Sequence, residues 1–177
     1  SESMRINWLI NLNQSLDLSP RNLFFGNQIV SKNNKIVVSS NKTTYVIDKN
    51  NGKIIFKKNF SSILKPVILN DYIFFITNNN LLISVNNLSG KIIYSYDINQ
   101  SIADFVKSKK KRVVFKKFLI SNNKILIFLE NSYLLIFNLN GTLEEIKKLP
   151  YKINSDPIIA KGSIIYLDRK NRIINLN

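Results

Sequence analysis

The hydrophobic positions of the chain return in a fixed order, in which short apolar runs are separated by polar turns that end in glycine. Three stretches carry this order most clearly: residues 45–56, 82–94 and 134–143. Their alternation and turn residues predict strands, and no helical period is present. A strand-only unit that returns after roughly 40 residues is typical of blade arrays. The pattern therefore predicts an all-β protein, a β-propeller of four-stranded antiparallel blades.

Four blades can be placed along the chain, with a fifth fragment before them. The expected blades cover approximately residues 28–60, 64–98, 113–149 and 153–177. Asn and Gly stand at their joints because both tolerate the positive φ of tight hairpin turns. The last blade is one strand short, and residues 5–12 are the expected extra strand, since Trp8 aligns with Phe56 and Tyr94. This strand either closes a four-bladed ring or belongs to a preceding blade.

Two pairs of phenylalanines and one single phenylalanine are expected to pack between neighbouring blades. They are Phe24-Phe25, Phe74-Phe75 and Phe118. Aromatic side chains of this kind bury large areas in a core. We therefore interpret them as core residues and not as an exposed binding patch.

Composition removes several kinds of chemistry. The 177-residue chain has no cysteine and no histidine, which excludes disulfides, imidazole bases and the commonest zinc ligands. Its apolar runs reach about six residues, far short of the ~20 that a membrane-spanning helix needs. The N-terminus lacks the order of a signal peptide, so the chain is expected either to be cytosolic or to have lost a leader.

The formal charge is strongly positive. There are 26 Lys and Arg against 11 Asp and Glu, a net charge of +15. A polyanionic partner would explain this balance. A bias toward A/T-rich codons explains it as well, because Lys, Ile and Asn are all abundant. We favour the compositional explanation.

One local cluster of cations stands out from this background. It consists of Lys107, Lys109, Lys110, Lys111 and Arg112, within an insertion that separates the second blade from the third. Inserted loops on rigid scaffolds often carry binding. The block could meet phosphate, an anionic lipid headgroup or an acidic protein surface, or it could be a solvated loop without a ligand. We refer to it as the basic loop and expect it to be the candidate partner-binding loop.

The repeat unit resembles the PQQ-like (quinoprotein-type) β-propeller repeat, whose usual form is approximately L-Y-A-L-D-x-x-T-G-K-x-x-W. Residues 45–56 fit this form best and residues 84–94 come second. The third repeat keeps Gly141 but has Glu145 where the aromatic residue belongs. The tryptophan of the family remains only as Trp8. The resemblance covers nearly the whole chain, but such a fold hosts several functions.

The resemblance implies a ring larger than four blades, since propellers of this type usually have seven or eight. The chain would then be half of a propeller, and two such halves could pair as a homodimer. Within the family, the degenerate repeats are most similar to the BamB-type outer-membrane assembly lipoproteins. This similarity implies a non-catalytic scaffold in the periplasm that binds other proteins, including outer-membrane assembly machinery, and that meets the membrane only through a lipid anchor.

Two other functions remain as alternatives. A fragment of a quinoprotein-type dehydrogenase would need a catalytic Asp, calcium held by oxygen ligands and a tryptophan floor. The acidic residues mostly occupy turns, and the adjacent pair Glu144-Glu145 would point to opposite faces of its strand. We therefore expect no enzyme, catalytic residue, cofactor or metal. A binder of nucleic acid or anionic lipid through the basic loop is the second alternative, with nucleic acid the less favoured.

Overall fold

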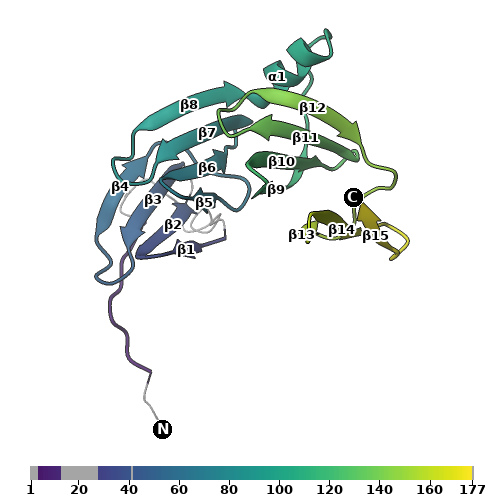
Figure 1. Ribbon diagram of the computed structural model, residues 1–177. Helices are drawn as coiled ribbons and strands as arrows, with labels where there is room; N and C mark the ends of the chain where they lie inside the picture. Colours follow the sequence, from purple (N-terminus) through teal and green to yellow (C-terminus); the bar gives the residue numbers. More distant parts are fainter. Residues whose placement is uncertain (1–3, 13–27, 41, 177) are drawn as a thin grey trace, which may run out of the picture.

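The chain folds into four antiparallel sheets that follow one another along an open arc (Figure 1). This computed structural model describes residues 4–12, 28–40 and 42–176. In each sheet the strands are hydrogen-bonded in the order of the sequence. The all-β propeller architecture that the repeats predict is thereby confirmed. Phe24-Phe25, expected in the core, lie outside the described residues.

The sheets form blades 1 to 4. Blade 1 contains β1 (Val30–Lys32), β2 (Lys35–Ser40), β3 (Thr43–Asp48) and β4 (Ile54–Lys58). Blade 2 contains β5 (Val67–Leu69), β6 (Tyr72–Ile76), β7 (Leu81–Asn86) and β8 (Ile92–Asp97). Blade 3 contains β9 (Phe115–Ser121), β10 (Lys124–Leu129), β11 (Tyr133–Asn138) and β12 (Leu143–Lys148). Blade 4 has three strands, β13 (Ile158–Ala160), β14 (Ser163–Leu167) and β15 (Ile173–Leu176).

The blades have an inner side, an outer side and two loop faces. The first strand of each sheet lies toward the inside of the arc, and β4, β8 and β12 lie on its outside (Figure 1). Because the strands are antiparallel, their loops alternate between the two ends of a blade. The connection face carries the loops 59–66, 77–80, 98–114, 130–132, 149–157 and 168–172 together with Lys42. The turn face carries the loops 33–34, 49–53, 70–71, 87–91, 122–123, 139–142 and 161–162.

The hydrophobic core lies between neighbouring blades. One cluster joins blades 1 and 2, a second joins blades 2 and 3, and a third joins blades 3 and 4. Phe74, Phe75 and Phe118 are buried in these clusters, as predicted. Each blade therefore depends on its neighbour for burial of its apolar face, as in other repeat proteins.

The same contact returns at successive junctions between blades. The ring of Phe56 on β4 lies against Gly90 of blade 2, where an added Cβ would come within 2.8 Å of it. At Gly141 of blade 3 two rings of β8 take this place, because an added Cβ would come within 2.5 Å of Tyr96 and within 2.8 Å of Tyr94. Both glycines have positive φ, 70° and 87°. Glycine thus serves two purposes here, because it allows the turn and leaves room for the ring.

The strand expected over residues 5–12 is not formed within the single chain. Residues 4–12 have no regular secondary structure. The segment lies beside the β3–β4 turn of blade 1, where the Trp8 indole donates a hydrogen bond to the carbonyl of Lys49 (2.8 Å). No described strand runs alongside the segment to pair with its backbone, which a strand requires. Blade 4 keeps three strands in the described residues, with β15 at its outer edge.

Candidate functional site

The basic loop follows a short helix that the repeats do not predict. This helix, α1 (Ile98–Phe105), begins directly after β8 and contacts β8 and β12. It projects from the outside of the arc between blades 2 and 3 (Figure 1). Within α1, Ile98 and Ala103 are buried. The residues from Asp104 to Arg112 are exposed.

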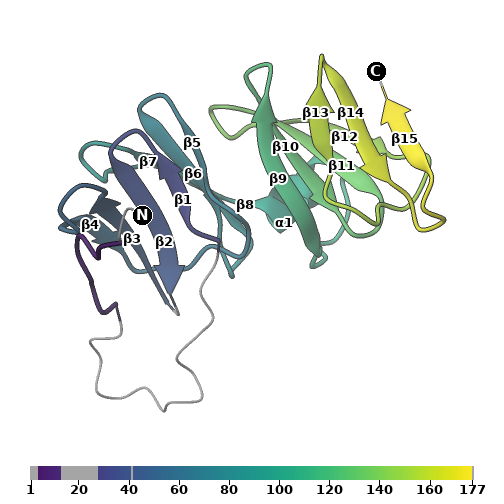
Figure 2. The same ribbon diagram turned by 90° about the horizontal axis from the view of Figure 1, so that it is seen from below.

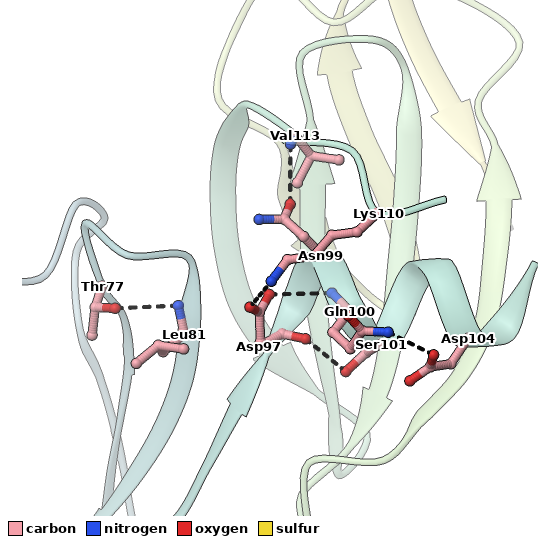
Figure 3. A network of polar contacts seen from close by, with 9 residues as sticks. All are labelled: Thr77, Leu81, Asp97, Asn99, Gln100, Ser101, Asp104, Lys110 and Val113. Carbon is pink, nitrogen blue, oxygen red and sulfur yellow. Dashed lines mark hydrogen bonds and ion pairs between the residues drawn. The ribbon is translucent and has the colours of Figure 1, made fainter. Parts of the chain in front are cut away.

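A polar side chain fixes the start of α1, as Figure 3 shows, and backbone hydrogen bonds fix its end. Asp97 is the N-cap, and its carboxylate accepts a hydrogen bond from the backbone N–H of Gln100 (3.1 Å). This bond satisfies one of the free N–H groups of the first turn. At the other end Lys107 adopts a positive φ of 51°, and the N–H of Ser108 reaches back to the carbonyl of Ala103 (2.9 Å). Such a left-handed residue ends a helix, although glycine is more usual there.

Two contacts tie the basic loop back to the start of α1 (Figure 3). The ammonium group of Lys110 forms an ion pair with the carboxylate of Asp97. The side-chain carbonyl of Asn99 accepts a hydrogen bond from the N–H of Val113 (3.1 Å), where the loop enters β9. The two ends of the insertion are therefore held close together by these contacts.

The ionisation of Asp97 depends on these contacts. Burial alone would raise its pKa, but the hydrogen bonds from Lys110 and from the backbone of Gln100, together with the charge of Lys110, hold the pKa below its ordinary value. Asp97 is thus ionised at neutral pH and can serve the helix and the loop at once.

The other cations of the loop face solvent. Lys107, Lys109, Lys111 and Arg112 are exposed, and none of them forms an ion pair within the described part of the chain. The sequence prediction placed these residues correctly in an insertion between two blades. It missed the helix, although the signal was present: Asp97 followed three residues later by Gln100 is a capping pattern.

Most loop cations of the protein lie on the connection face, to which the basic loop belongs. Besides the five of the loop, this face carries Lys42, Lys65, Lys152, Arg169, Lys170 and Arg172. The acidic residues of the same loops are Asp104, Glu130, Asp156 and Asp168. In the described residues, the turn face has Lys49, Lys53, Lys91 and Lys161, against Asp71. The excess follows from the longer loops of the connection face, chiefly from the insertion.

The connection face also holds a hollow and a structural ion pair. A hollow of about 310 Å³ lies between blades 1 and 2, lined by Lys42 and by amide side chains such as Asn59 and Asn78. At blade 4 the buried carboxylate of Asp168 accepts hydrogen bonds from the backbone and side chain of Arg172. The contact between Asp168 and Arg172 stabilises the β14–β15 turn, and the buried carboxylate is not accessible to a ligand.

The acidic residues do not converge on a cofactor site. No group of three acidic, His or Cys side chains that could hold a metal ion occurs among the described residues. Glu144 pairs with Lys124 and Glu145 pairs with Lys147, each on its own. The hydrogen bond from Lys124 lowers the pKa of Glu144 against the opposing effect of desolvation. The two carboxylates therefore act in separate surface ion pairs.

Among the described residues, the one helix is too short and too polar to cross a bilayer.

Comparison with known proteins finds similar structures but no similar sequence. No protein-family model and no curated protein matches the chain. BamB from Moraxella catarrhalis is similar in structure, with a TM-score of 0.67 and 11% identity over 85% of this chain and 43% of that one. The computationally designed Ika8 protein gives a TM-score of 0.59 and 8% identity over 84% of this chain and 44% of Ika8. The designed Ika4 protein gives 0.58 and 8% over 83% of this chain and 87% of Ika4.

The chain thus spans less than half of BamB and of Ika8. At these identities the likeness shows the fold alone. It supports a BamB-like propeller architecture, in agreement with the resemblance of the repeats.

Proposed function

We propose that this protein is a non-catalytic scaffold that binds other proteins and supports outer-membrane β-barrel assembly in the periplasm, as BamB-type lipoproteins do. The similarity of the fold to BamB and the match of residues 45–56 to the repeat both support this proposal. A scaffold of this kind needs rigid blades that hold binding loops in fixed positions. A second copy of the chain is a further protein partner that we propose, because the arc is open.

The observation that carries the proposal is the construction of the basic loop. Its base is fixed by Asp97 and Asn99, while Lys109, Lys111 and Arg112 project free into solvent. Because the base of the loop is already fixed, its backbone loses less conformational freedom when the loop binds a partner. We therefore assign the loop to an acidic surface of a partner protein, which such charges would steer and orient.

Site-specific photo-crosslinking in the cells that produce the protein tests this assignment. A photoreactive residue is placed at Lys109 or Lys111, and matched controls carry it at Lys49 or Lys53 on the turn face. We expect the loop positions, and not the controls, to crosslink to a β-barrel outer-membrane protein or to an assembly factor, identified by mass spectrometry. Products formed with nucleic acid or lipid alone would overturn the proposal.

A charge variant tests the alternative ligands in vitro. Lys109, Lys111 and Arg112 are replaced by Ser, while Lys107 stays because its backbone ends α1. A control replaces Lys49 and two other turn-face lysines, Lys53 and Lys91, so that both variants lose the same charge. Retention on anionic vesicles or on RNA that falls steeply with salt, and that only the loop variant abolishes, would favour the lipid or nucleic-acid function instead. Equal behaviour of the two variants toward these probes is expected for a protein scaffold.

The quinoprotein alternative has its own test. Calcium and pyrroloquinoline quinone are added to the full chain, and the absorbance of the quinone is followed. A scaffold leaves the spectrum unchanged, whereas a saturable change would show a cofactor site and contradict the proposal.

A further inference from the structure

The N-terminal segment occupies the place that the outer strand of a preceding blade would fill. The ring of Trp8 lies against Gly52, where an added Cβ would come within 2.8 Å of it. Phe56 of blade 1 makes the same contact with Gly90 of blade 2, at the same distance. Trp8 therefore makes with blade 1 the same ring–glycine contact that Phe56, on the outer strand of blade 1, makes with blade 2.

A hydrogen bond repeats along with the ring contact. The indole N–H of Trp8 donates to the carbonyl of Lys49, the residue that follows β3 (2.8 Å). Two junctions further along the arc, between blades 2 and 3, the hydroxyl of Tyr94 donates to the carbonyl of Leu139, the residue that follows β11 (2.9 Å). Burial raises the pKa of Tyr94, so this hydroxyl remains a donor. The two acceptors hold equivalent positions in their blades.

A third contact fixes the direction of the segment. The carbonyl of Leu12, four residues after Trp8, accepts a hydrogen bond from Tyr45 of β3 (3.3 Å). Phe60, four residues after Phe56, packs edge-on against Phe75 of blade 2 with ring centroids 5.2 Å apart. The segment thus crosses blade 1 along the path that the end of blade 1 takes across blade 2.

The segment nevertheless has no sheet of its own. The side chains of Ile6 and Leu9 are 83% and 82% exposed. In β4, whose sequence aligns with the segment, the backbone pairs with β3. Residues 5–12 therefore have the sequence of an outer strand but lack a sheet edge with which their backbone can pair.

Blade 4 offers such an edge and such a face. Ile173 of β15 is 75% exposed, although the equivalent residues of blades 1 to 3, Thr44, Leu82 and Leu134, are at most 2% exposed. Those residues face the following blade, whereas in the described part of the chain no further blade lies against Ile173. Ile158 on the same side of blade 4 is 58% exposed. The far face of blade 4 is therefore built to be covered.

The opposite end of the arc is only partly covered. Val38 and Tyr45 on the free side of blade 1 are half-buried, whereas Phe75 and Ile83 at the same positions of blade 2 are buried. Blade 1 with its N-terminal segment and blade 4 lie at opposite ends of the arc in both views (Figures 1 and 2). Within one chain, the segment is therefore remote from β15.

We propose that a second copy of this chain closes the ring by exchanging strands. Blade 4 of one copy packs against blade 1 of the other, and residues 5–12 of that other copy become the fourth strand beside β15. Trp8 keeps its place on Gly52 of its own chain, so the segment binds both molecules at once. Two copies related by a twofold axis make both junctions alike, and each of the sheets in the described residues then has four strands.

Light scattering on the 177-residue chain tests the association. We expect twice the chain mass of 20.5 kDa. Ile173→Lys should give a folded monomer, because the residue is exposed in the single chain and a lysine would be buried only in the pair. Leu88→Lys is the matched control, since Leu88 is 70% exposed on the turn face and should leave the dimer intact. A wild-type monomer at all concentrations, or a dimer that survives Ile173→Lys, overturns the proposal.

A crosslink tests the exchange itself. Lys57 pairs with Tyr45 and Ser95 with Ile83 in the complete blades, and this register places Leu9 opposite Ile174. Paired residues of neighbouring strands have Cα atoms about 5 Å apart, within the range of a disulfide. The chain has no cysteine of its own, so Leu9→Cys with Ile174→Cys should form a disulfide between chains.

The control for the crosslink pairs Leu9→Cys with Ile158→Cys on the inner strand of blade 4, which should not link. A dimer in which the Leu9–Ile174 pair stays reduced contradicts strand exchange. A disulfide within a single monomer also contradicts it, because it would show a ring closed by one chain.

Discussion

Replacing Gly90 by alanine should destabilise the junction between blades 1 and 2 in two separable ways. Gly90 has φ of +70°, a conformation that alanine adopts only with strain. The new Cβ would also lie 2.8 Å from the ring of Phe56. Gly162 isolates the first effect, since it has φ of +86° and no atom within 4 Å of an added Cβ.

The structure sets the size of the two effects. A non-glycine residue in the left-handed region costs about 1–2 kcal/mol, and both variants bear this cost. Forcing a methyl group into a packed contact costs about 1–3 kcal/mol more, and only Gly90→Ala bears it. The free energy of unfolding should therefore fall by ~1–2 kcal/mol in Gly162→Ala and by ~2–5 kcal/mol in Gly90→Ala.

Urea unfolding followed by circular dichroism measures both losses, and a double-mutant cycle assigns the difference. Phe56→Ala removes the ring, so in that background Gly90→Ala should cost no more than Gly162→Ala. The coupling between positions 56 and 90 should then be about 1–3 kcal/mol, the overpacking cost. Equal losses in the two glycine variants, or no coupling with Phe56, would show that the ring contact does not hold the blades together.

Three further changes have defined outcomes. Asp97→Ala should lower the free energy of unfolding by ~1 kcal/mol through loss of the helix cap, whereas Asp97→Asn should retain most of it. Because folding lowers the pKa of Asp97, its stabilisation is complete at neutral pH and is lost as the pH falls below about 3.9 toward the folded value; acid titration of unfolding should show this loss in wild type and not in Asp97→Asn. Gly52→Ala should displace the ring of Trp8, the only tryptophan, and increase its quenching by acrylamide, while Gly90→Ala should not. Asp168→Ala removes the buried acceptor of the β14–β15 turn and should speed amide hydrogen exchange across blade 4, leaving blade 2 unchanged.

Much of the fold could be predicted because particular residue types, above all glycine, mark its turns. Gly52 and Gly90 come four residues after their strands and Gly141 comes three, and all three have positive φ in the structure. Local chemistry of this kind depends only on neighbours in the sequence. The blades could therefore be placed without knowledge of their packing.

The parts that could not be predicted depend on partners distant in the sequence. Residues 5–12 have the composition of a strand, but a strand exists only where another lies beside it, and composition does not identify that neighbour. Trp8 was aligned correctly with Phe56, and its contact with Gly52 follows from that alignment. For the candidate site, the cations were placed in an insertion. The helix that precedes them was missed because Asp97 and Gln100 stand within a stretch that was otherwise interpreted as strand and loop.

The acceptors at the blade junctions have a consequence for how such a protein can change over time. Lys49, Asn87 and Leu139 each offer a backbone carbonyl at the same place, and the donors are an indole, an ammonium group from Lys35 and a phenol. A main-chain oxygen is present whatever residue carries it, so substitution at these positions does not erase the docking point. The donors differ both in chemistry and in the strand that carries them, β2 for Lys35 and β8 for Tyr94, while the acceptor stays in place. The sequence of an array joined in this way can diverge far from those of its relatives while the fold is retained.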